Sequence, residues 1–448
     1  MGLRLIRILS VCLLMVSSVW QAAAYATQFT DETQTVRLRW KTNLISVAVS
    51  TSLIKSNPYI KSGTDVEGAI ERSLVSWEKV ADIKFQISWT DKQTVSPAGK
   101  SGDGVSLITV ASTPENLVLF GEDAQETSAK TRTFFNRKGS ITEADIVLNP
   151  YAQFSTDGSF GTFDLEATLT HEIGHLLGLE HSSVMGATMH AHAGKNGIYN
   201  LPSFGARTLS EDDIAGVRSL YGAKNPSDVC CGIVSGKLTT ANGKPAKNFQ
   251  VWAEDFDSGR VAAGVVSSAD GSFQIEGLAV GRYKIYTQAG EKFAGKLYSV
   301  ETIGEVEISR GKTVNIVKKV GGGGGKKSFD LNYVGFNGQI SDLAIPVNGG
   351  KSYIIYVGGK NLNAENTTIG FNSPFLKVTP KSLTNQDYGE DISVISFEVK
   401  VAADIPLGEY SFFLQTANDE VQFAVGSLTV ESFVNPWNSY FSLEQTAN

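Results

Sequence analysis

Residues 171–181 read His-Glu-Ile-Gly-His-Leu-Leu-Gly-Leu-Glu-His, and they carry the strongest structural signal in this 448-residue chain. All five histidines of the chain lie within or shortly after this stretch. Side chains four residues apart project from one face of a helix, so His171 and His175 can bind the same metal ion. Gly178 can adopt the backbone turn that ends a helix. The chain then turns back, and His181 can reach the same ion.

Three histidine ligands indicate a catalytic zinc site, because they leave the fourth coordination position to water. Glu172 follows the first ligand directly, from where it can reach that water but not easily the ion. Zinc lowers the pKa of bound water to about 7. Glu172 can then take the proton as the water attacks a peptide carbonyl and pass it to the leaving amine. The pattern therefore predicts one zinc ion held by His171, His175 and His181, with Glu172 as general base and acid.

The alternative is structural, since a short His-Glu-x-x-His match occurs by chance in helices. A lone pair of such histidines is more often a salt-bridged or partly exposed feature. The extension through Gly178 to His181 disfavours that alternative. His190 and His192 lack ligand spacing, so we expect them on the wall of the pocket or on the surface.

Length and charge limit the class of protein. A chain of 448 residues exceeds one ordinary core and predicts about three domains. The 39 Lys and Arg residues are outnumbered by 46 Asp and Glu residues, which gives a net charge of −7. A nucleic-acid-binding protein would show a basic patch or stripe, so this balance argues against one.

The first 26 residues have the pattern of a secretion signal. Arg4 and Arg7 precede a short apolar run at 8–19, and small residues around Ala24 form a cleavage site. The alternative is a membrane anchor, but the run is short for a membrane span. We expect a signal peptide at 1–26 and a secreted, periplasmic or cell-surface protein.

Signal cleavage would leave Cys230 and Cys231 as the remaining cysteines. Adjacent cysteines can bond to each other only in a strained ring. The pair could be redox-active, could join two chains or could be inert; the last two alternatives are favoured. Stability is expected to come from hydrophobic cores, because two cysteines form no disulfide framework.

Residues 27–222 predict a domain of mixed helix and strand. Helix starts are indicated by a capping box at Thr64–Glu67, by Asp164 before the histidine helix, and by a capping box of Ser210 and Asp213. The last helix is expected to end near Tyr221. Apolar runs predict strands at 44–50, 83–89 and 144–149.

The pattern changes to a period of two after a linker at 223–231. Asn242-Gly243 and Asp270-Gly271 indicate hairpin turns within a β-domain at 232–320. The side chains expected to face its interior are Val251, Phe273, Ile275, Tyr283 and Ile285. The glycine-rich segment 321–327 predicts a flexible linker.

Residues 328–448 form a third block with a C-terminal tail. Ile395, Phe397, Val399 and Val401 alternate with Ser396, Glu398 and Lys400, as in a half-buried strand. Both C-terminal blocks contain Gly-x-Tyr, ending at Tyr283 and Tyr410. This resembles the tyrosine that closes a corner of an immunoglobulin-like sandwich. We expect two all-β sandwich domains.

The extended histidine motif is that of the metzincin peptidases. Within them the chain resembles the matrixins, the matrix-metalloproteinase-like family. Ser182 follows the third histidine as in matrixins, 181–189 resembles their approach to the Met-turn, and 209–222 resembles their closing helix. The resemblance covers roughly 36–222.

The resemblance implies an α+β catalytic domain, with a twisted mixed sheet over helices. It implies an endopeptidase that binds an extended substrate along a sheet edge. It assigns His171, His175 and His181 as ligands, Glu172 as base and acid, and Met189 as the Met-turn residue beneath the metal.

Departures from the family limit what can be carried over. No histidine precedes His171, so the second, structural zinc site of animal matrixins is expected to be absent. After signal cleavage no thiol is left for a cysteine switch. Calcium often stabilises the family fold, and Asp145 and Asn149 are its candidate ligands. The sequence from His190 to Ala193 replaces the usual proline and tyrosine, so substrate preference is not carried over.

The second block resembles transthyretin-like, carboxypeptidase-regulatory-like domains through Ser235–Leu238, Asn242–Pro245, Asp270–Phe273 and Gly281–Tyr283. The third has a general immunoglobulin-like pattern. For both, spacing, substrate docking and attachment to a cell surface or matrix remain open.

The function expected is a secreted zinc metalloendopeptidase that acts on extracellular proteins or peptides, without nucleic acid or a membrane span. One alternative is a surface adhesin whose peptidase domain is secondary or inactive. Another is a zinc-binding pseudoenzyme, which the intact Glu172 disfavours. Hydrolysis of a bond other than a peptide is a third.

Overall fold

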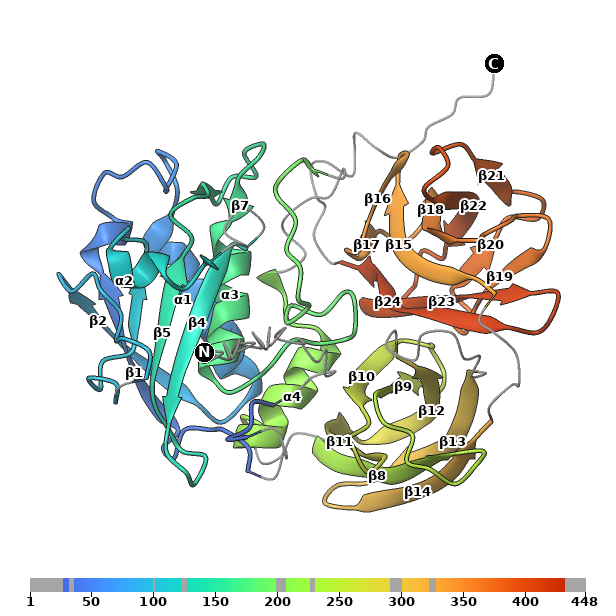
Figure 1. Ribbon diagram of the computed structural model, residues 1–448, viewed down its shortest axis with the longest axis horizontal. Coiled ribbons are helices and arrows are strands. Elements are labelled where there is room, and N and C mark those ends of the chain that lie inside the picture. The colour runs from blue at the N-terminus through green and yellow to red at the C-terminus, as the bar shows by residue number, and fades with distance from the viewer. Residues whose placement is uncertain are drawn as a thin grey trace, which may run out of the picture.

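The computed structural model describes residues 27–31, 36–99, 101–121, 127–198, 207–225, 230–290, 300–321 and 328–431. The expected signal peptide and residues 322–327 of the expected linker lie outside this range. Figure 1 shows an α/β part on the left, one β-sandwich at the lower right and another at the upper right. The predicted fold class, an α+β domain followed by two β-sandwiches, is confirmed.

The α/β domain is built on a five-stranded mixed sheet in the order β2-β1-β3-β5-β4. The neighbours from β2 to β5 pair in parallel, and β4 is antiparallel to β5 at the edge. Two strands differ slightly from the predicted runs, since β2 is shifted by one residue and β5 begins earlier. The bounds are β1 Leu44–Ser50, β2 Lys84–Thr90, β3 Leu107–Thr109, β4 Ala129–Phe135 and β5 Ile141–Leu148.

Three long helices accompany this sheet: α1 (Val66–Val80), α3 (Leu165–Leu176) and α4 (Glu211–Tyr221). Shorter elements are the 3₁₀ turn Thr51–Leu53, α2 (Pro114–Leu117) and the two-stranded pair β6 (Phe154–Ser155) and β7 (Phe163–Asp164).

The caps of these helices follow local sequence signals, with one correction. Asp164 caps α3 by accepting the N–H of Ala167 at 2.8 Å, and Ser210 forms the predicted capping box at the start of α4. At α1 the predicted box at Thr64–Glu67 is wrong by one position. Asp65 is the N-cap and accepts the N–H of Gly68 at 3.0 Å. Asp65 lies directly before the first turn, and its carboxylate accepts a free N–H group there, the role that the prediction gave to Thr64.

Trp77 fixes α1 against α3 in the core of this domain. Its side chain is fully buried, and its indole N–H donates to the carbonyl of Thr170 at 2.9 Å. Because the buried indole keeps its hydrogen bond, the burial of its apolar surface stabilises the fold by about 1.5–3 kcal/mol or more. The helix that carries the histidines is therefore held on its inner side.

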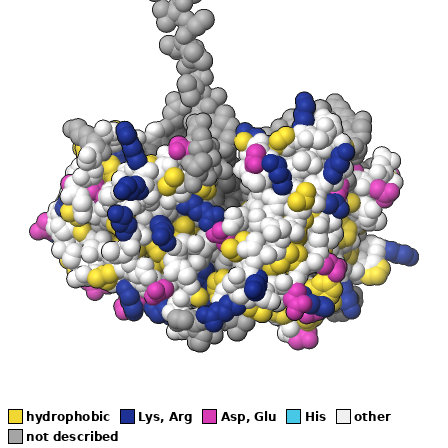
Figure 2. All heavy atoms as spheres, turned by 90° about the horizontal axis from the view of Figure 1, so that it is seen from below, with side chains coloured by type: hydrophobic (Ala, Val, Ile, Leu, Met, Phe, Trp, Pro, Cys, Tyr) yellow, Lys and Arg dark blue, Asp and Glu magenta, His cyan; other side chains and the backbone are white. Residues whose placement is uncertain are grey.

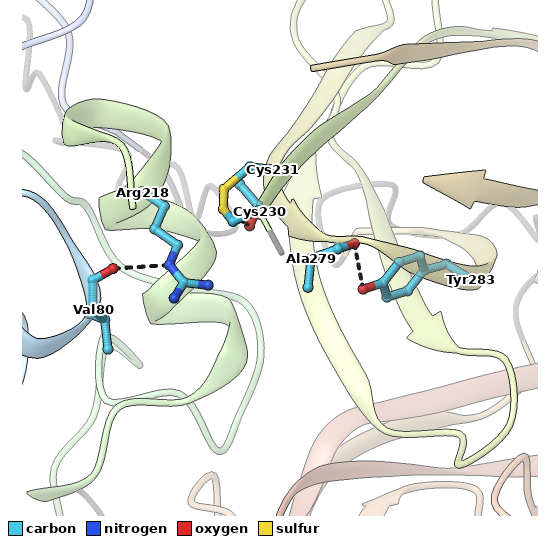
Figure 3. Close-up of a disulfide and its surroundings, with 7 residues drawn as sticks. Val80, Arg218, Cys230, Cys231, Ala279 and Tyr283 are labelled. Atoms are coloured by element: carbon cyan, nitrogen blue, oxygen red, sulfur yellow. Dashed lines mark hydrogen bonds between the residues drawn. A yellow bond between two sulfur atoms is a disulfide. The ribbon is translucent and has the colours of Figure 1, made fainter. Parts of the chain in front are cut away.

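The second domain is a sandwich of two sheets, β10-β9-β12-β13 and β11-β8-β14. The five side chains predicted to face inward are all buried. The tyrosine corner is formed, since the hydroxyl of Tyr283 donates to the carbonyl of Ala279 at 3.0 Å (Figure 3). The strands are β8 Cys230–Thr240, β9 Phe249–Asp255, β10 Val261–Val266, β11 Ser272–Ala279, β12 Gly281–Ala289, β13 Glu301–Ile308 and β14 Thr313–Val320.

Cys230 and Cys231 are bonded to each other at the start of β8. A bond within the chain differs from the expectation that the pair joins two chains, and it is compatible with the alternative that the pair is inert. Figure 3 places the disulfide opposite Arg218 of α4, whose guanidinium donates to the carbonyl of Val80 at 3.0 Å. The pair thus lies where the first domain meets the second.

The third domain is a second sandwich, with sheets β16-β15-β18-β22-β20 (β21 also pairs with β22) and β17-β24-β23-β19. Its predicted inward residues on β22 are buried. Ser396, predicted to face outward, is buried as well; β21 pairs with β22 at this position, and the hydroxyl of Ser396 accepts from the side-chain amide of Gln386. The hydroxyl of Tyr410 donates to the carbonyl of Pro406 at 2.8 Å, which forms the second tyrosine corner.

The strands of the third domain are β15 Asp330–Phe336, β16 Gln339–Ser341, β17 Ile345–Val347, β18 Ser352–Lys360, β19 Thr367–Phe371, β20 Leu376–Val378, β21 Thr384–Gln386, β22 Ser393–Val401, β23 Gly408–Thr416 and β24 Val421–Val430.

The three domains meet in one small hydrophobic cluster, which we call the junction cluster. The first domain contributes Val184 and Ala187, the second Trp252, Val261 and Tyr286, and the third Val425. The ring of Trp252 stacks on that of Tyr286 with centroids 5.4 Å apart. The segment between the third histidine of the motif and Met189 is thereby packed against both sandwiches.

In the described part of the chain, no helix is long and apolar enough to cross a membrane. On the face seen in Figure 2, Lys and Arg side chains are interspersed with acidic and hydrophobic ones.

Candidate active site

The histidines are positioned by the end of α3. His171 and His175 lie on successive turns of the helix, which ends at Leu176. Gly178 has a φ of +98°, a backbone conformation that strains residues with a Cβ. An added Cβ there would also lie 2.5 Å from the carbonyl oxygen of Leu38. Glycine is therefore required at the point where the chain turns back toward His181.

The three histidine rings converge. One nitrogen of each ring, from His171, His175 and His181, lies within 4.8 Å of the others. Nε2 of His175 and Nε2 of His181 are 3.2 Å apart. Zinc–nitrogen bonds of about 2.0–2.1 Å in a tetrahedral arrangement place two ligand nitrogens about 3.3 Å apart. The donor set and its spacing fit a zinc ion.

Backbone carbonyls orient two of the rings. Nδ1 of His171 lies 2.7 Å from the carbonyl oxygen of Thr188, and Nδ1 of His175 lies 2.9 Å from that of Leu179. A carbonyl oxygen only accepts, so each Nδ1 carries the proton. The lone pair of each imidazole then lies on Nε2, as is usual in zinc sites.

Burial favours the neutral form of His175 and His181. It is the main cause that lowers the pKa of His175 to about 4, with the neighbouring His171 as the second cause. Burial also lowers the pKa of His181, followed by the charges of His175 and His171. Neutral imidazole is the form that binds a metal, so the site requires little deprotonation before binding.

Glu172 lies beside the histidines with its carboxylate buried. The hydroxyl of Thr131, on edge strand β4, donates to Oε2 of Glu172 at 2.5 Å. Sequence reasoning missed Thr131, because no strand was predicted over 129–135. The alternating Thr-Arg-Thr pattern there was a weak signal for β4, but it did not indicate a contact with Glu172.

Met189 lies under the histidine helix and is almost completely buried. A Cβ on Gly174 would lie 2.2 Å from its sulfur, so the helix and the methionine approach closely only because residue 174 is glycine. The N–H groups of Thr188 and Met189 donate to the two carboxylate oxygens of Asp213, at 2.8 and 3.0 Å. Asp213, predicted as part of a helix cap, thus also holds the methionine segment.

A cavity of about 500 Å³ contains this constellation. One wall is formed by residues 127–131, which include the start of β4, and another by the exposed face of α3. The segment 185–195 and several residues of the third domain complete the lining. His190 and His192 line it, and both contact Asp342. Nε2 of His190 lies 3.0 Å from the carbonyl oxygen of Asp342, and Nδ1 of His192 lies 2.5 Å from its carboxylate.

The two candidate calcium ligands are engaged with protein groups. Both oxygens of the buried Asp145 carboxylate accept backbone N–H groups, from Ser96 and from Leu107, each at 2.9 Å. The side chain of Asn149 bonds to the carbonyl of Thr127 and to the N–H of Tyr151. Burial, mainly, raises the pKa of Asp145 to about 7. These contacts give calcium binding at the two residues no support.

Comparison with known protein families agrees with this geometry. Residues 117–222 match the family model of matrixin, and residues 233–317 match that of the carboxypeptidase regulatory-like domain. The chain therefore contains a matrixin domain followed by a carboxypeptidase regulatory-like domain. The matrixin match includes the whole histidine motif and α4.

Several curated proteins are similar to part of the chain. Metalloendoproteinase 1-MMP of Arabidopsis thaliana is 29% identical over 225 residues, which cover 47% of this chain and 52% of that protein. Metalloendoproteinase 1 of Glycine max is 30% identical over 35% of this chain and 45% of its own length. Interstitial collagenase of Oryctolagus cuniculus is 27% identical over 37% of this chain and 30% of its own length. The chain spans about half the length of the first two.

Among solved structures, BcpA, the major pilin subunit of Bacillus cereus, aligns with 43% of this chain and 66% of its own at 14% identity. The TM-score of 0.17 is too low to support a statement about fold.

Proposed function

We propose that the chain is a secreted zinc metalloendopeptidase that hydrolyses peptide bonds of extracellular proteins. The observation that carries this proposal is the convergence of one ring nitrogen from each of three histidines beside the buried side chain of Glu172, within one cavity. The matrixin domain and the metalloendoproteinase relatives support the reaction class. The proposal of secretion rests on the sequence pattern of residues 1–26.

His171, His175 and His181 would hold the ion, and Met189 would pack beneath it. A bound zinc ion supplies a Lewis acid that polarises the scissile carbonyl and makes a water molecule more acidic. Glu172 accepts a proton from the attacking water and returns it to the leaving nitrogen. The Thr131 hydroxyl holds Oε2 of Glu172, so we assign the proton transfer to Oε1.

The substrate would bind as an extended chain along β4. This strand pairs with β5 on one side and ends the sheet on the other. A free strand edge can accept a peptide as an additional strand, with main-chain hydrogen bonds fixing its register. Residues 127–131 line the cavity beside the histidines, so a peptide in that register would present a peptide bond to the site.

The test compares three forms of the chain without residues 1–26: the unchanged protein, Glu172→Ala, and Glu71→Ala as a control on the exposed face of α1. Unfolded casein and a quenched peptide library would be the substrates, with zinc content measured in each protein. We expect Glu172→Ala to keep one zinc and to lose about 10²–10⁴-fold in kcat, while Glu71→Ala changes little.

Equal activity of Glu172→Ala would refute the assigned mechanism. Zinc binding without cleavage by the unchanged protein would refute the endopeptidase itself and favour a surface-binding protein. Binding of the two sandwich domains to cells or matrix would then be the next measurement.

A further inference from the structure

The third domain contributes directly to the active-site cavity. The cavity that contains the three histidines and Glu172 is also lined by residues about 160 to 260 positions further along the chain. These belong to β17, to the loop before it, and to the end of β24: Leu343, Ala344, Pro346, Thr429 and Glu431. The two strands are neighbours, with Pro346 opposite Thr429 in a parallel pair. We call this set the third-domain wall.

The third-domain wall is fixed relative to the histidines. The N–H of Met185 donates to the carbonyl of Val425 at 3.0 Å. A Cβ on Gly186 would lie 2.5 Å from the hydroxyl oxygen of Thr429 and 3.0 Å from the carbonyl oxygen of Gly426, so this close approach requires a glycine at residue 186. The junction cluster lies beside these contacts. A close-packed apolar contact of this kind transmits position rather than absorbing movement.

Asp342, which directly precedes the third-domain wall, also holds the segment 190–193 of the first domain. Asp342 contacts His190 through its carbonyl and His192 through its carboxylate. These two histidines stand where the family carries a proline and a tyrosine. The segment 190–193 is therefore positioned by a residue of another domain.

Glu431 is the unusual member of the wall. Its Oε2 is shielded from solvent and has no hydrogen-bond partner among the described residues. Burial raises the pKa of its carboxyl to about 7. Glu431 as a whole is half-buried, so its carboxyl can be reached from the cavity. A carboxyl oxygen that is shielded from water and has no hydrogen-bond partner costs stability, and a bound partner would offset that cost. A lysine or arginine side chain is the partner that forms the strongest hydrogen bonds with it.

The neighbours of Glu431 suit the stem of such a side chain. Leu343, Ala344 and Pro346 present apolar surface within the same wall. Long basic side chains pack their methylene groups on apolar surface while the charged head reaches a polar group. The lysines that line the cavity come from the first domain, at Lys130 and Lys195, and Lys195 lies over the ring of Phe163 at 5.2 Å.

We propose that the third domain determines specificity, and that Glu431 binds a lysine or arginine side chain of the substrate polypeptide. This inference rests on the proposed peptidase function. It gives the third domain a role inside the active site, whereas the sequence also allowed a role as a spacer or in attachment to a surface. The peptide would lie between β4 and the third-domain wall, with one basic side chain directed at Glu431.

The test uses the full chain without residues 1–26 and paired quenched peptides. Each pair carries arginine or its neutral isostere citrulline at one position on either side of the cleaved bond. The variants are Glu431→Gln, Glu431→Lys and, as a matched control, Glu365→Gln, which lies exposed on the same domain. Circular dichroism and zinc content verify that each variant is folded and loaded.

We expect the unchanged protein to prefer arginine over citrulline by about tenfold or more in kcat/KM at one position, as one hydrogen bond between charged groups allows. Glu431→Gln should reduce this preference to about twofold, mainly by lowering kcat/KM for the arginine peptides. Glu431→Lys should invert it, and Glu365→Gln should keep it.

Two results would overturn the inference: no arginine preference at any position in the unchanged protein, or a preference that persists in Glu431→Gln. If these peptides are cleaved in a Glu172-dependent manner without preference, the specificity role alone fails. If the unchanged protein cleaves none of them, the peptidase function fails together with it.

Discussion

The hydroxyl of Thr131 donates a 2.5 Å hydrogen bond to Oε2 of Glu172, and so ties the edge strand to the proposed general base. The two residues are 41 positions apart in the chain. Substrate binding along β4 and proton transfer by Glu172 are thus linked by one side chain. A shift of the strand edge would move the carboxylate.

Replacing Thr131 by valine keeps the shape of the side chain and removes the donor. A hydrogen bond to a charged group is worth about 1.5–3 kcal/mol, so kcat should fall by about 10- to 100-fold with zinc content unchanged. Steady-state kinetics on one peptide would measure this. Thr133→Val, on the same strand, is the control and should remain within about twofold. An unchanged kcat in Thr131→Val would show that Glu172 needs no support from β4.

Gly178→Ala should damage the metal site through the backbone. The alanine would need a φ of +98° and would place its Cβ 2.5 Å from the Leu38 carbonyl. We expect a loss of about 2–4 kcal/mol in unfolding free energy and weaker zinc binding. Gly63→Ala separates the two causes, because Gly63 has a φ of +86° with open space around it. It should lose about 1 kcal/mol and bind zinc normally; equal behaviour of both variants would contradict the steric argument.

Removal of the metal should abolish activity and lower the melting temperature. A ligand that binds only the folded chain stabilises it, by about 4 kcal/mol at a thousandfold excess over its Kd. We expect one zinc per chain by elemental analysis, and none in His171→Ala. A second zinc that remains in His171→Ala would contradict the expectation that the family's structural site is absent.

Glu254 should make stability depend on pH. Its buried carboxylate accepts the N–H of Trp252 at 2.9 Å and that of Asn372, in the third domain, at 2.7 Å. Burial raises its pKa to about 7, although the hydrogen bonds from Asn372, Trp252 and Ser411 and the charge of Lys284 act against this. The folded state then holds a proton that the unfolded state has released between about pH 4.5 and 7. Stability should therefore fall as the pH rises through this window.

Glu254→Gln removes that proton equilibrium at Glu254. The free energy of unfolding, measured with urea at pH 4.5, 6 and 8, should decline as the pH rises. This decline should be smaller in Glu254→Gln by on the order of 1–3 kcal/mol. Glu305→Gln, on an exposed position of β13, should behave as the unchanged protein. Identical pH dependence in all three proteins would show that Glu254 stays ionised in the folded chain.

Local signals explain which features the sequence predicts well. The cap of α3 at Asp164 and the box at Ser210 depend on residues within three positions of one another. The same holds for the two tyrosine corners, where the hydroxyl bonds to a carbonyl four residues earlier. The spacing of the histidines is also local, and the structure brings them together as that spacing suggests.

Features that depend on distant segments were not predictable in this way. Nothing near Thr131 indicates that it will contact Glu172, and nothing near Glu431 indicates that it will line the same cavity as the histidines. Both contacts are produced by tertiary packing, in one case between strand and helix and in the other between domains. The error at Thr64 has a different origin, since two neighbouring residues can each cap a helix and only the backbone path decides between them.

The junction cluster has a consequence for how this protein can be assembled and altered. Val184 and Ala187 lie between the third histidine of the motif and Met189, and they are buried by residues of both sandwiches. A peptidase domain without the sandwiches would expose this surface next to its own metal-binding segment. The three domains are therefore not independent modules. A sandwich of the same fold could replace one of them only if it kept the fit to this loop of the active site. The same constraint holds for the subunit interface of an obligate oligomer.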